Sequence, residues 1–323
     1  MAGSTVFRPH PLLRGGDVQT LAGVYLPGPH CVYKAQQRIV TLSDGDRLVL
    51  HDDCPPGWCA GDRTALMIHG LSGCHQSPYM KRIAARLEQE GVRVFRMDLR
   101  GCGAGLALAK LPYHSGRSED AAAALMTVAE LCPDSPTALI GFSMGGNIAL
   151  KLLGELGDRP CGHLDRAVAV CPPIDLAPAV ENLHRPRNRL YERHFIRSLV
   201  QQVRRREQVI PDLPITDFRP LPRSLWEFDD VFTAPVSGFG RAVDYYRAAG
   251  AVRVAEGIRL PALVIAAQDD PLIPVTPLER LRGCPSVELC ITRHGGHVGF
   301  VGWRDSGRRW LDERIAEWVV GEG

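Results

Sequence analysis

Long apolar runs are missing from this 323-residue sequence, and so is any strong excess of charge. No stretch approaches the roughly 18 apolar residues of a membrane-spanning helix, and the opening residues lack the apolar centre of a secretory signal. We therefore expect a cytoplasmic protein without stable insertion into a membrane. The formal net charge of +2 is too small for extensive neutralisation of nucleic-acid phosphates, so we expect no nucleic-acid partner.

Closely spaced metal-binding residues are missing too. Ten cysteines are spread along the chain without a CxxC pair. Cys171 and Cys290 lie in apolar runs, where a reduced thiol packs like a small hydrophobic residue. Cys54 and Cys59 have no nearby pair of histidines that could complete a zinc site. We expect reduced cysteines, no metal and no cofactor.

What the sequence does contain is an alternation of short apolar runs with helical patterns, which is typical of a parallel sheet flanked by helices. The apolar runs predict strands at 64–69, 92–98, 137–141, 167–171, 262–267 and 287–292. Apolar residues at helical spacing predict helices at 78–90, at 119–131 and from about Ser306 to Val320. The expected fold class is α/β with a mostly parallel central sheet.

The interval between the fourth and fifth of these strands does not fit the alternation. It is rich in proline and arginine and contains one clear amphipathic helix, with Phe195, Leu199 and Val203 on its apolar face. We interpret it as a helical lid over the carboxyl ends of the strands. The expected units are an N-terminal extension packed on the core (1–35), the α/β core (36–175 and 258–323) and the lid (176–257).

The segment Gly141-Phe142-Ser143-Met144-Gly145 matches GxSxG, and it lies between an apolar strand and a helical pattern, as a nucleophile elbow requires. The turn holds its serine in a strained conformation in which neighbouring Cβ atoms would collide, so glycines are needed. The following helix presents N–H groups that favour developing negative charge. Ser143 is the candidate nucleophile, and the alternative is a serine that merely caps the helix.

A serine hydroxyl is a weak nucleophile at neutral pH, so it needs a histidine as base and a carboxylate that fixes the tautomer of that histidine. Asp269 and Asp270 follow one late strand, and His297 follows the next in the loop HGGHVGF. The two glycines before His297 favour it over the rival His294. Adjacent side chains point in different directions, so only one aspartate can face His297. We choose Asp270, which directly precedes Pro271.

Acyl transfer also needs preorganised N–H donors for the oxyanion. The N–H of Met144, next to the candidate nucleophile, is one expected donor. The HGLSG loop after the first predicted strand is placed for the second, with Leu71 as the donor because Gly70 permits close approach of the backbone. We expect His69 to be structural, since a second base would be redundant.

Several other polar residues could contact a substrate. His75, His114 and Asp120 lie in polar loops near the carboxyl edge of the sheet, where hydrogen bonding within the loops is the simpler interpretation. The run Arg204-Arg205-Arg206 could attract anionic lipid headgroups, but we expect it to be solvated on the outer face of its helix.

Longer motifs run through nearly the whole chain: HGLSGCHQSPYM, RMDLRGCGAG, LPYHSGRSED, GFSMGGN, EFDDVFTAPVSGFGRAVDYYRAA and HGGHVGF. Together they resemble the YheT-like family of α/β-hydrolases, which spans bacterial esterase-like proteins and eukaryotic relatives that act on phospholipids. The segment Asp17-Val18-Gln19-Thr20-Leu21 resembles a His-Leu-Gln-Thr segment of that family. The chain departs from the family pattern at Ala267, often glycine in related hydrolases, and at Ser237, where a histidine is expected.

The resemblance implies hydrolysis of carboxylic esters, with acyl lipids among the candidate substrates, no cofactor, and a triad of Ser143, Asp270 and His297. The sequence leaves two alternatives open. The same triad serves an acyltransferase or a thioesterase, and the same fold serves non-catalytic proteins that bind a ligand in the pocket. The expected partner in every case is a small molecule.

Overall fold

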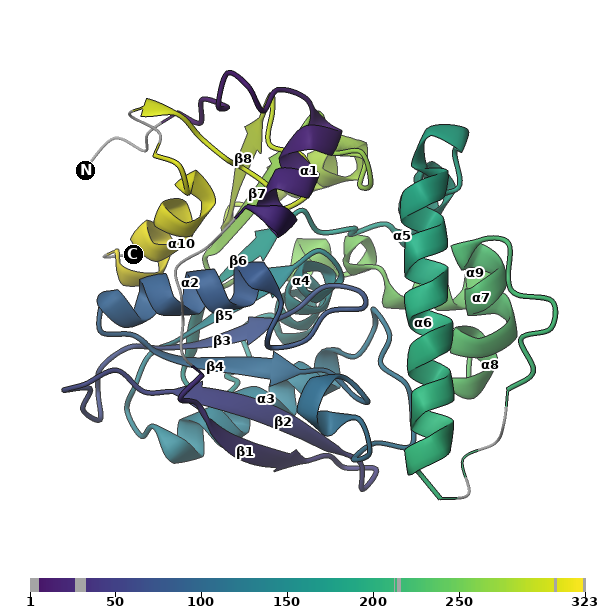
Figure 1. Ribbon diagram of the computed structural model, residues 1–323. Coiled ribbons are helices and arrows are strands. Elements are labelled where there is room, and N and C mark those ends of the chain that lie inside the picture. Colours follow the sequence, from purple (N-terminus) through teal and green to yellow (C-terminus); the bar gives the residue numbers. More distant parts are fainter. Residues whose placement is uncertain (1–5, 27–32, 212, 214–215, 305–306, 322–323) are drawn as a thin grey trace.

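One eight-stranded sheet forms the centre of the computed structural model, which describes residues 6–26, 33–211, 213, 216–304 and 307–321 (Figure 1). The strand order is β1-β2-β4-β3-β5-β6-β7-β8. The strands are β1 (Gln36–Thr41), β2 (Arg47–Asp53), β3 (Thr64–Ile68), β4 (Arg93–Asp98), β5 (Thr137–Phe142), β6 (Leu164–Val170), β7 (Ala262–Ala267) and β8 (Val287–Thr292). Strand β2 is antiparallel to β1 and β4, and all other neighbours are parallel. The predicted α/β fold with a mostly parallel sheet is confirmed.

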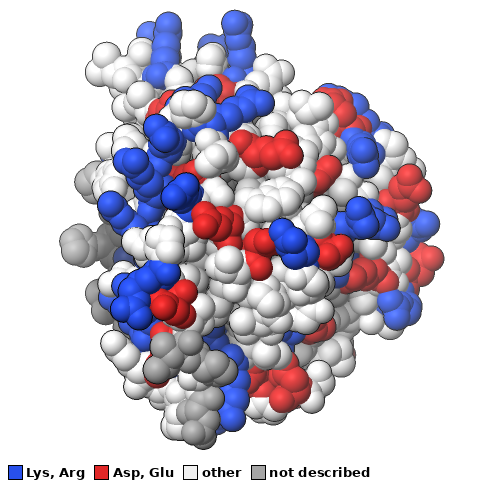
Figure 2. Space-filling model, turned by 90° about the vertical axis from the view of Figure 1, so that its right-hand side faces the viewer, with Lys and Arg blue, Asp and Glu red and all other residues white. Residues whose placement is uncertain are grey.

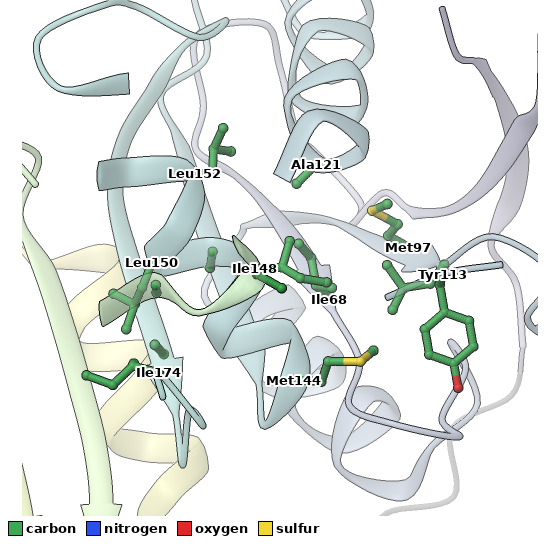
Figure 3. Packing of buried hydrophobic residues seen from close by; sticks show 14 of the residues in the cluster. Ile68, Met97, Tyr113, Ala121, Met144, Ile148, Leu150, Leu152 and Ile174 are labelled. Atoms are coloured by element: carbon green, nitrogen blue, oxygen red, sulfur yellow. The ribbon is translucent and has the colours of Figure 1, made fainter. Parts of the chain in front are cut away.

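Helices cover both faces of the sheet, so strands β3, β5 and β7 are buried from end to end. The helices against the sheet are α2 (Pro78–Gln89), α3 (Ser118–Leu131), α4 (Met144–Leu156) and α10 (Trp310–Val320). Successive side chains of a strand point to opposite faces. Met67 of β3 therefore packs on the side of α2 and α10, and Ile68 packs on the side of α3 and α4. Figure 3 shows Ile68 beside Ile148 of α4.

Outside 176–257, the described residues form two strands and a helix that were not predicted from the sequence. Strands β1 and β2 form one edge of the sheet, and β1 begins with the exposed residues Gln36 and Gln37, so no continuous apolar run marks it. Helix α1 (Gly16–Tyr25) buries glutamine, threonine and glycine besides alanine, so its apolar pattern is weak. The last helix begins at Trp310, and its predicted start at Ser306 lies outside the described residues.

Between β6 and β7 the chain leaves the sheet and forms a group of helices. They are α5 (Leu176–Leu183), α6 (Arg189–Val209), α7 (Leu225–Phe228), α8 (Ala234–Val236) and α9 (Ala242–Ala249). Figure 1 shows α6 to α9 side by side at one end of the sheet. The predicted apolar face of α6 is buried at Leu199 and Val203 and half-buried at Phe195. None of the described helices combines the length and the apolar character that crossing a bilayer requires.

Arg206 of α6 is buried, so the prediction of a fully solvated arginine run is wrong at this position. Arg204 and Arg205 are exposed. Arg206 lies three positions after Val203, so helical periodicity returns it to the apolar face. Its Nη2 donates hydrogen bonds to three carbonyl oxygens of the loop 109–111, at 2.9 to 3.2 Å. Figure 2 shows that exposed basic side chains on this side of the molecule gather along one edge and elsewhere mix with acidic ones.

Replacing Arg206 with methionine tests this connection between α6 and the core. Arg206→Met leaves the loop carbonyls without their donor, so we expect the free energy of unfolding to fall by about 1–3 kcal/mol. Arg205→Met on the exposed side is the matched control and should stay within about 0.5 kcal/mol of the unmodified protein. Denaturant titration of the three proteins checks this, and equal stability of the two variants would contradict it.

Asp229, which directly follows α7, is a buried carboxyl group without a cationic partner among the described residues. The Tyr246 hydroxyl of α9 donates a 2.7 Å hydrogen bond to its Oδ2. Burial raises the pKa of Asp229 from 3.8 to about 6 despite hydrogen bonds that favour the charged form. Since the folded chain binds this proton more tightly than the unfolded chain, the Asp229 contribution to stability is lost as the pH rises through about 6.

Asp229→Asn should therefore stabilise the protein above pH 6 and change little below pH 4. A shift of about two pKa units corresponds to at most about 3 kcal/mol. The neighbouring Asp230 forms a surface ion pair with Arg241, so Asp230→Asn should change stability by less than about 1 kcal/mol and in the opposite direction. Thermal unfolding between pH 4 and 8 measures both variants. An Asp229→Asn protein that is no more stable at pH 8 would refute the assignment.

Candidate active site

Ser143 lies at a sharp turn between β5 and α4, with φ 52° and ψ −119°, a conformation that residues with a side chain rarely adopt. The two glycines of the motif have no space for a side chain. A Cβ on Gly141 would collide with the carbonyl group of Gly145, and a Cβ on Gly145 would collide with the carbonyl oxygen of Ile68 in β3. The turn therefore has the strained geometry that GxSxG predicts, and it presents Ser143 at the carboxyl end of the sheet.

His297 and Asp270 form a hydrogen-bonded pair. The Nδ1 of His297 lies 2.8 Å from Oδ2 of Asp270, and both side chains are largely buried. The other carboxylate oxygen accepts the N–H groups of Leu272 and Ile273 at 2.8 and 3.0 Å, which fixes the orientation of the carboxylate. Because Nδ1–H is donated to Asp270, the lone pair of the neutral ring is on Nε2.

The neighbouring Asp269 forms a separate hydrogen-bonded pair with His294. Oδ2 of Asp269 lies 3.1 Å from Nδ1 of His294, and Oδ1 accepts the N–H of Gly296 at 2.9 Å. The two adjacent aspartates therefore hold different histidines. His294 and a backbone N–H satisfy Asp269, and Asp270 is the aspartate that pairs with His297.

One pocket is lined by four of the five site residues selected from the sequence, namely Leu71, Ser143, Met144 and His297, and Asp270 lies behind His297. Its walls are mostly apolar and come from α5, α6, the segment 225–233 and the loop after β7, with Leu176, Val180, Phe195, Leu199, Phe228 and Leu272 among them. Polar residues line it as well, among them His114, Arg206 and Asp229. Neither Arg206 nor Asp229 was predicted from the sequence as a pocket residue, although the helical period of α6 could have identified Arg206.

The loop that carries Leu71 is held from behind by two tyrosine hydroxyls. Gly70 donates its N–H to Tyr79 at 2.9 Å, and Ser72 donates its N–H to Tyr113 at 3.2 Å. Burial raises the pKa of Tyr79 to about 12, so its hydroxyl stays protonated at neutral pH. The backbone on either side of Leu71 is therefore fixed.

Leu71 and Met144 offer N–H groups beside Ser143. Gly70, the neighbour of Leu71, is so close to the serine that a Cβ on it would lie 3.1 Å from the Cβ of Ser143. Met144 is the first residue of α4, where an N–H has no acceptor within its own helix. Within the described part of the chain, no hydrogen bond takes either N–H. Both groups are available to an oxygen atom in the pocket.

His69 is structural, as predicted. It is fully buried, and its Nε2 accepts the N–H of Leu99 at 3.2 Å, so Nδ1 carries the proton and donates to the Gly70 carbonyl at 2.8 Å. Burial lowers the pKa of His69, which keeps the ring neutral. The ring connects the loop at Leu71 to the end of β4.

Hydrogen bonding within the protein is confirmed for His75 and Asp120, but Asp120 lies in the first turn of α3 and not in a loop as predicted. His75 Nδ1 lies 2.8 Å from Asp98 Oδ2, and Asp120 accepts two 2.7 Å hydrogen bonds from Arg100. His114 lines the pocket instead. Burial lowers its pKa to about 3, so it is a neutral ring in the pocket wall.

In the described part of the chain, two groups of side chains have the donor types of a metal site, namely His51 with His75 and Asp98, and Cys171 with the Asp270–His297 pair. The rings of His51 and His75 stack with centroids 3.4 Å apart, so an ion between them would lie outside both ring planes, where imidazole lone pairs do not point. Both rings instead approach Asp98 at 2.8 and 2.9 Å. Cys171 directs its thiol to the Gly296 carbonyl, so the second group is occupied by hydrogen bonds.

The chain is similar to named hydrolases over most of its length. A family model described as the alpha/beta hydrolase fold matches residues 66–302. The candidate esterase YheT of Escherichia coli (strain K12) is 32% identical over 284 residues, covering 86% of this chain and 83% of that protein. The monoacylglycerol lipase of Saccharomyces cerevisiae (strain ATCC 204508 / S288c) is 26% identical, covering 91% of this chain and 66% of the longer yeast protein.

Solved structures agree on the fold. The Pyrococcus furiosus esterase Pf2001 matches with a TM-score of 0.58 and 19% identity, covering 98% of each chain. At this identity the likeness carries the fold alone. With the family match and the identity to YheT across most of both chains, the protein belongs to the YheT-like α/β-hydrolases.

Proposed function

We propose that the protein hydrolyses carboxylic esters of acyl lipids, with Ser143 as nucleophile, His297 as general base and Asp270 as the acid that orients the base. The observation that carries this proposal is the 2.8 Å hydrogen bond between His297 and Asp270, in the pocket that Ser143 also lines. The esterase and lipase names of the similar proteins support the same reaction class.

In the first step, Nε2 of His297 accepts the proton of the Ser143 hydroxyl while the oxygen attacks the ester carbonyl. Asp270 keeps the tautomer with the free lone pair on Nε2 and stabilises the imidazolium that forms. The carbonyl oxygen becomes an oxyanion, for which the N–H groups of Leu71 and Met144 are the donors.

Collapse of this intermediate breaks the bond to the alcohol, which leaves with the proton held by His297. An acyl group then remains on Ser143. Water enters, gives a proton to His297 and attacks the acyl carbonyl, and collapse of the second intermediate releases the carboxylic acid and returns the proton to Ser143. No cofactor is needed for any of these steps.

The pocket walls favour an acyl chain over a polar substrate. Phe195, Leu199 and Val203 of α6 line the pocket, and the eight steps along the helix from Phe195 to Val203 correspond to about 12 Å. An apolar wall of this length suits the chain of a fatty acyl ester. Residues 176–257 act as a lid in this proposal because their helices close the pocket over the carboxyl end of the sheet. The relative named as a monoacylglycerol lipase supports a lipid substrate.

Ser143→Ala should reduce turnover of a medium-chain p-nitrophenyl ester by about 10³-fold or more, because it removes the nucleophile and leaves the backbone of the turn in place. Nitrophenol release measures the rate, and circular dichroism with thermal unfolding checks the fold. Turnover near that of the unmodified protein, in a folded variant, would remove Ser143 from the mechanism.

The adjacent aspartates provide a matched pair of variants. Asp270→Asn should lower kcat by about 10⁴-fold, because an amide cannot hold the required tautomer of His297. Asp269→Asn should lower it less than about tenfold, since Asp269 faces His294 and a backbone N–H. The same nitrophenol assay ranks them, and the reverse order of activity would show that Asp269 is the acid.

A further inference from the structure

Helix α1 docks on both loops that carry the proposed acid and base. Gly16, Thr20 and Gly23 are four and three residues apart, so they share one face of the helix. A Cβ on Gly16 would collide with the carbonyl oxygen of Asp269, and a Cβ on Gly23 would lie 2.8 Å from the Cα of Gly299. The helix backbone therefore rests directly on the two loops, which requires glycine at these contacts.

On this face of α1, Thr20 makes a direct polar contact with His297, the proposed base. Its Oγ1 accepts the backbone N–H of His297 at 2.8 Å and donates its own proton to the carbonyl oxygen of Gly16 at 2.7 Å. Because the hydroxyl makes both hydrogen bonds at once, it is held in one orientation. The N–H of His297 consequently has a fixed acceptor on a different element of the fold.

Gln19 holds the far side of the same loop and is completely buried. Its Oε1 accepts the N–H of Val301 at 2.7 Å, and its Nε2 donates to the Val301 carbonyl at 3.1 Å and to the Leu13 carbonyl at 2.6 Å. Val301 follows His297 by four residues. Neighbouring residues of α1 thus hold the loop at two points.

The loop needs such support because its own backbone is unfavourable. Val298 and Phe300 have φ values of 58° and 44°, in the region that β-branched and bulky residues avoid. Conformations of this kind persist only where the surroundings impose them. Gly296, directly before the histidine, leaves no space for a side chain against Gly16 and Thr20.

From these contacts we propose that Thr20, in the segment Asp17-Val18-Gln19-Thr20-Leu21, is a positioning residue for the base. It acts through the backbone N–H of His297 and sets the direction of the imidazole between Asp270 and Ser143. The inference rests on the proposed function only for its effect on turnover. The effect on the His297–Asp270 hydrogen bond does not depend on the identity of the substrate.

The test compares Thr20→Val with Thr20→Ser and with a control variant in another helix. Thr20→Val removes the hydroxyl at nearly constant volume, and Thr20→Ser retains it. Thr127 of α3 makes the same bond to the carbonyl four residues earlier, at 3.1 Å, so Thr127→Val controls for loss of a threonine hydroxyl in a helix. Thr20→Ala replaces the valine variant if that protein does not fold.

We expect Thr20→Val to lower kcat by about 10- to 100-fold with little change in KM, because a small displacement of a catalytic group has this effect. Thr20→Ser and Thr127→Val should stay within about threefold of the unmodified protein. The second readout is the Nδ1–H proton of His297 in the NMR spectrum of ¹⁵N-histidine-labelled protein, identified by its loss in His297→Gln. Its exchange with solvent should accelerate at least about tenfold in Thr20→Val alone.

Unchanged kcat and unchanged proton exchange in a folded Thr20→Val protein would overturn the proposal. Equal losses in Thr20→Val and Thr127→Val would also overturn it, since they would indicate a general effect on stability. If the unmodified protein hydrolyses no ester but Thr20→Val accelerates the exchange, the proposed function fails and the positioning role stands.

Discussion

The contact between the turn at Ser143 and strand β3 is the constraint on which the rest of the site depends. Gly145 lies so close to the Ile68 carbonyl that no side chain fits between them. The turn therefore cannot move unless the centre of the sheet moves with it. The segments with Leu71, Ser143, Asp270 and His297 follow β3, β5, β7 and β8, which are parallel and end at the same edge. Parallel strands thus bring together residues that are up to 226 positions apart in the chain.

Buried polar groups stand behind three of these segments, those with Leu71, Asp270 and His297. Two tyrosine hydroxyls and the neutral ring of His69 hold the loop at Leu71. Two backbone N–H groups hold the carboxylate of Asp270. Helix α1 holds the loop at His297 through Gln19 and Thr20. Buried groups with fully used hydrogen bonds are rigid, so the pocket can be apolar toward the substrate while its supports are polar.

The sequence predicted the strands that carry apolar runs. Strands β3 to β7 carry such runs because helices cover both sides of the sheet there, and the half-buried edge strand β8 carries one as well. The opposite edge strand β1 begins with exposed glutamines, and β2 is buried but ends in the polar residues His51, Asp52 and Asp53, so neither was predicted. Chain order and glycine spacing were enough to select the pairs at the site. They could not show that α1 supports His297, because its contacts use glycine backbones and the polar Gln19 and Thr20. Arg206 was misjudged because the charge run was considered without its helical period.

The most direct measurement of the central claim is covalent labelling of the folded protein with a p-nitrophenyl alkylphosphonate. An activated serine displaces nitrophenol and keeps the phosphonyl group, so the account predicts one equivalent of nitrophenol and a single adduct on the peptide that contains Ser143. His297→Gln should label far more slowly, because the serine then has no base. A folded protein that forms no adduct, or an adduct on a different residue at the same rate, would contradict the account.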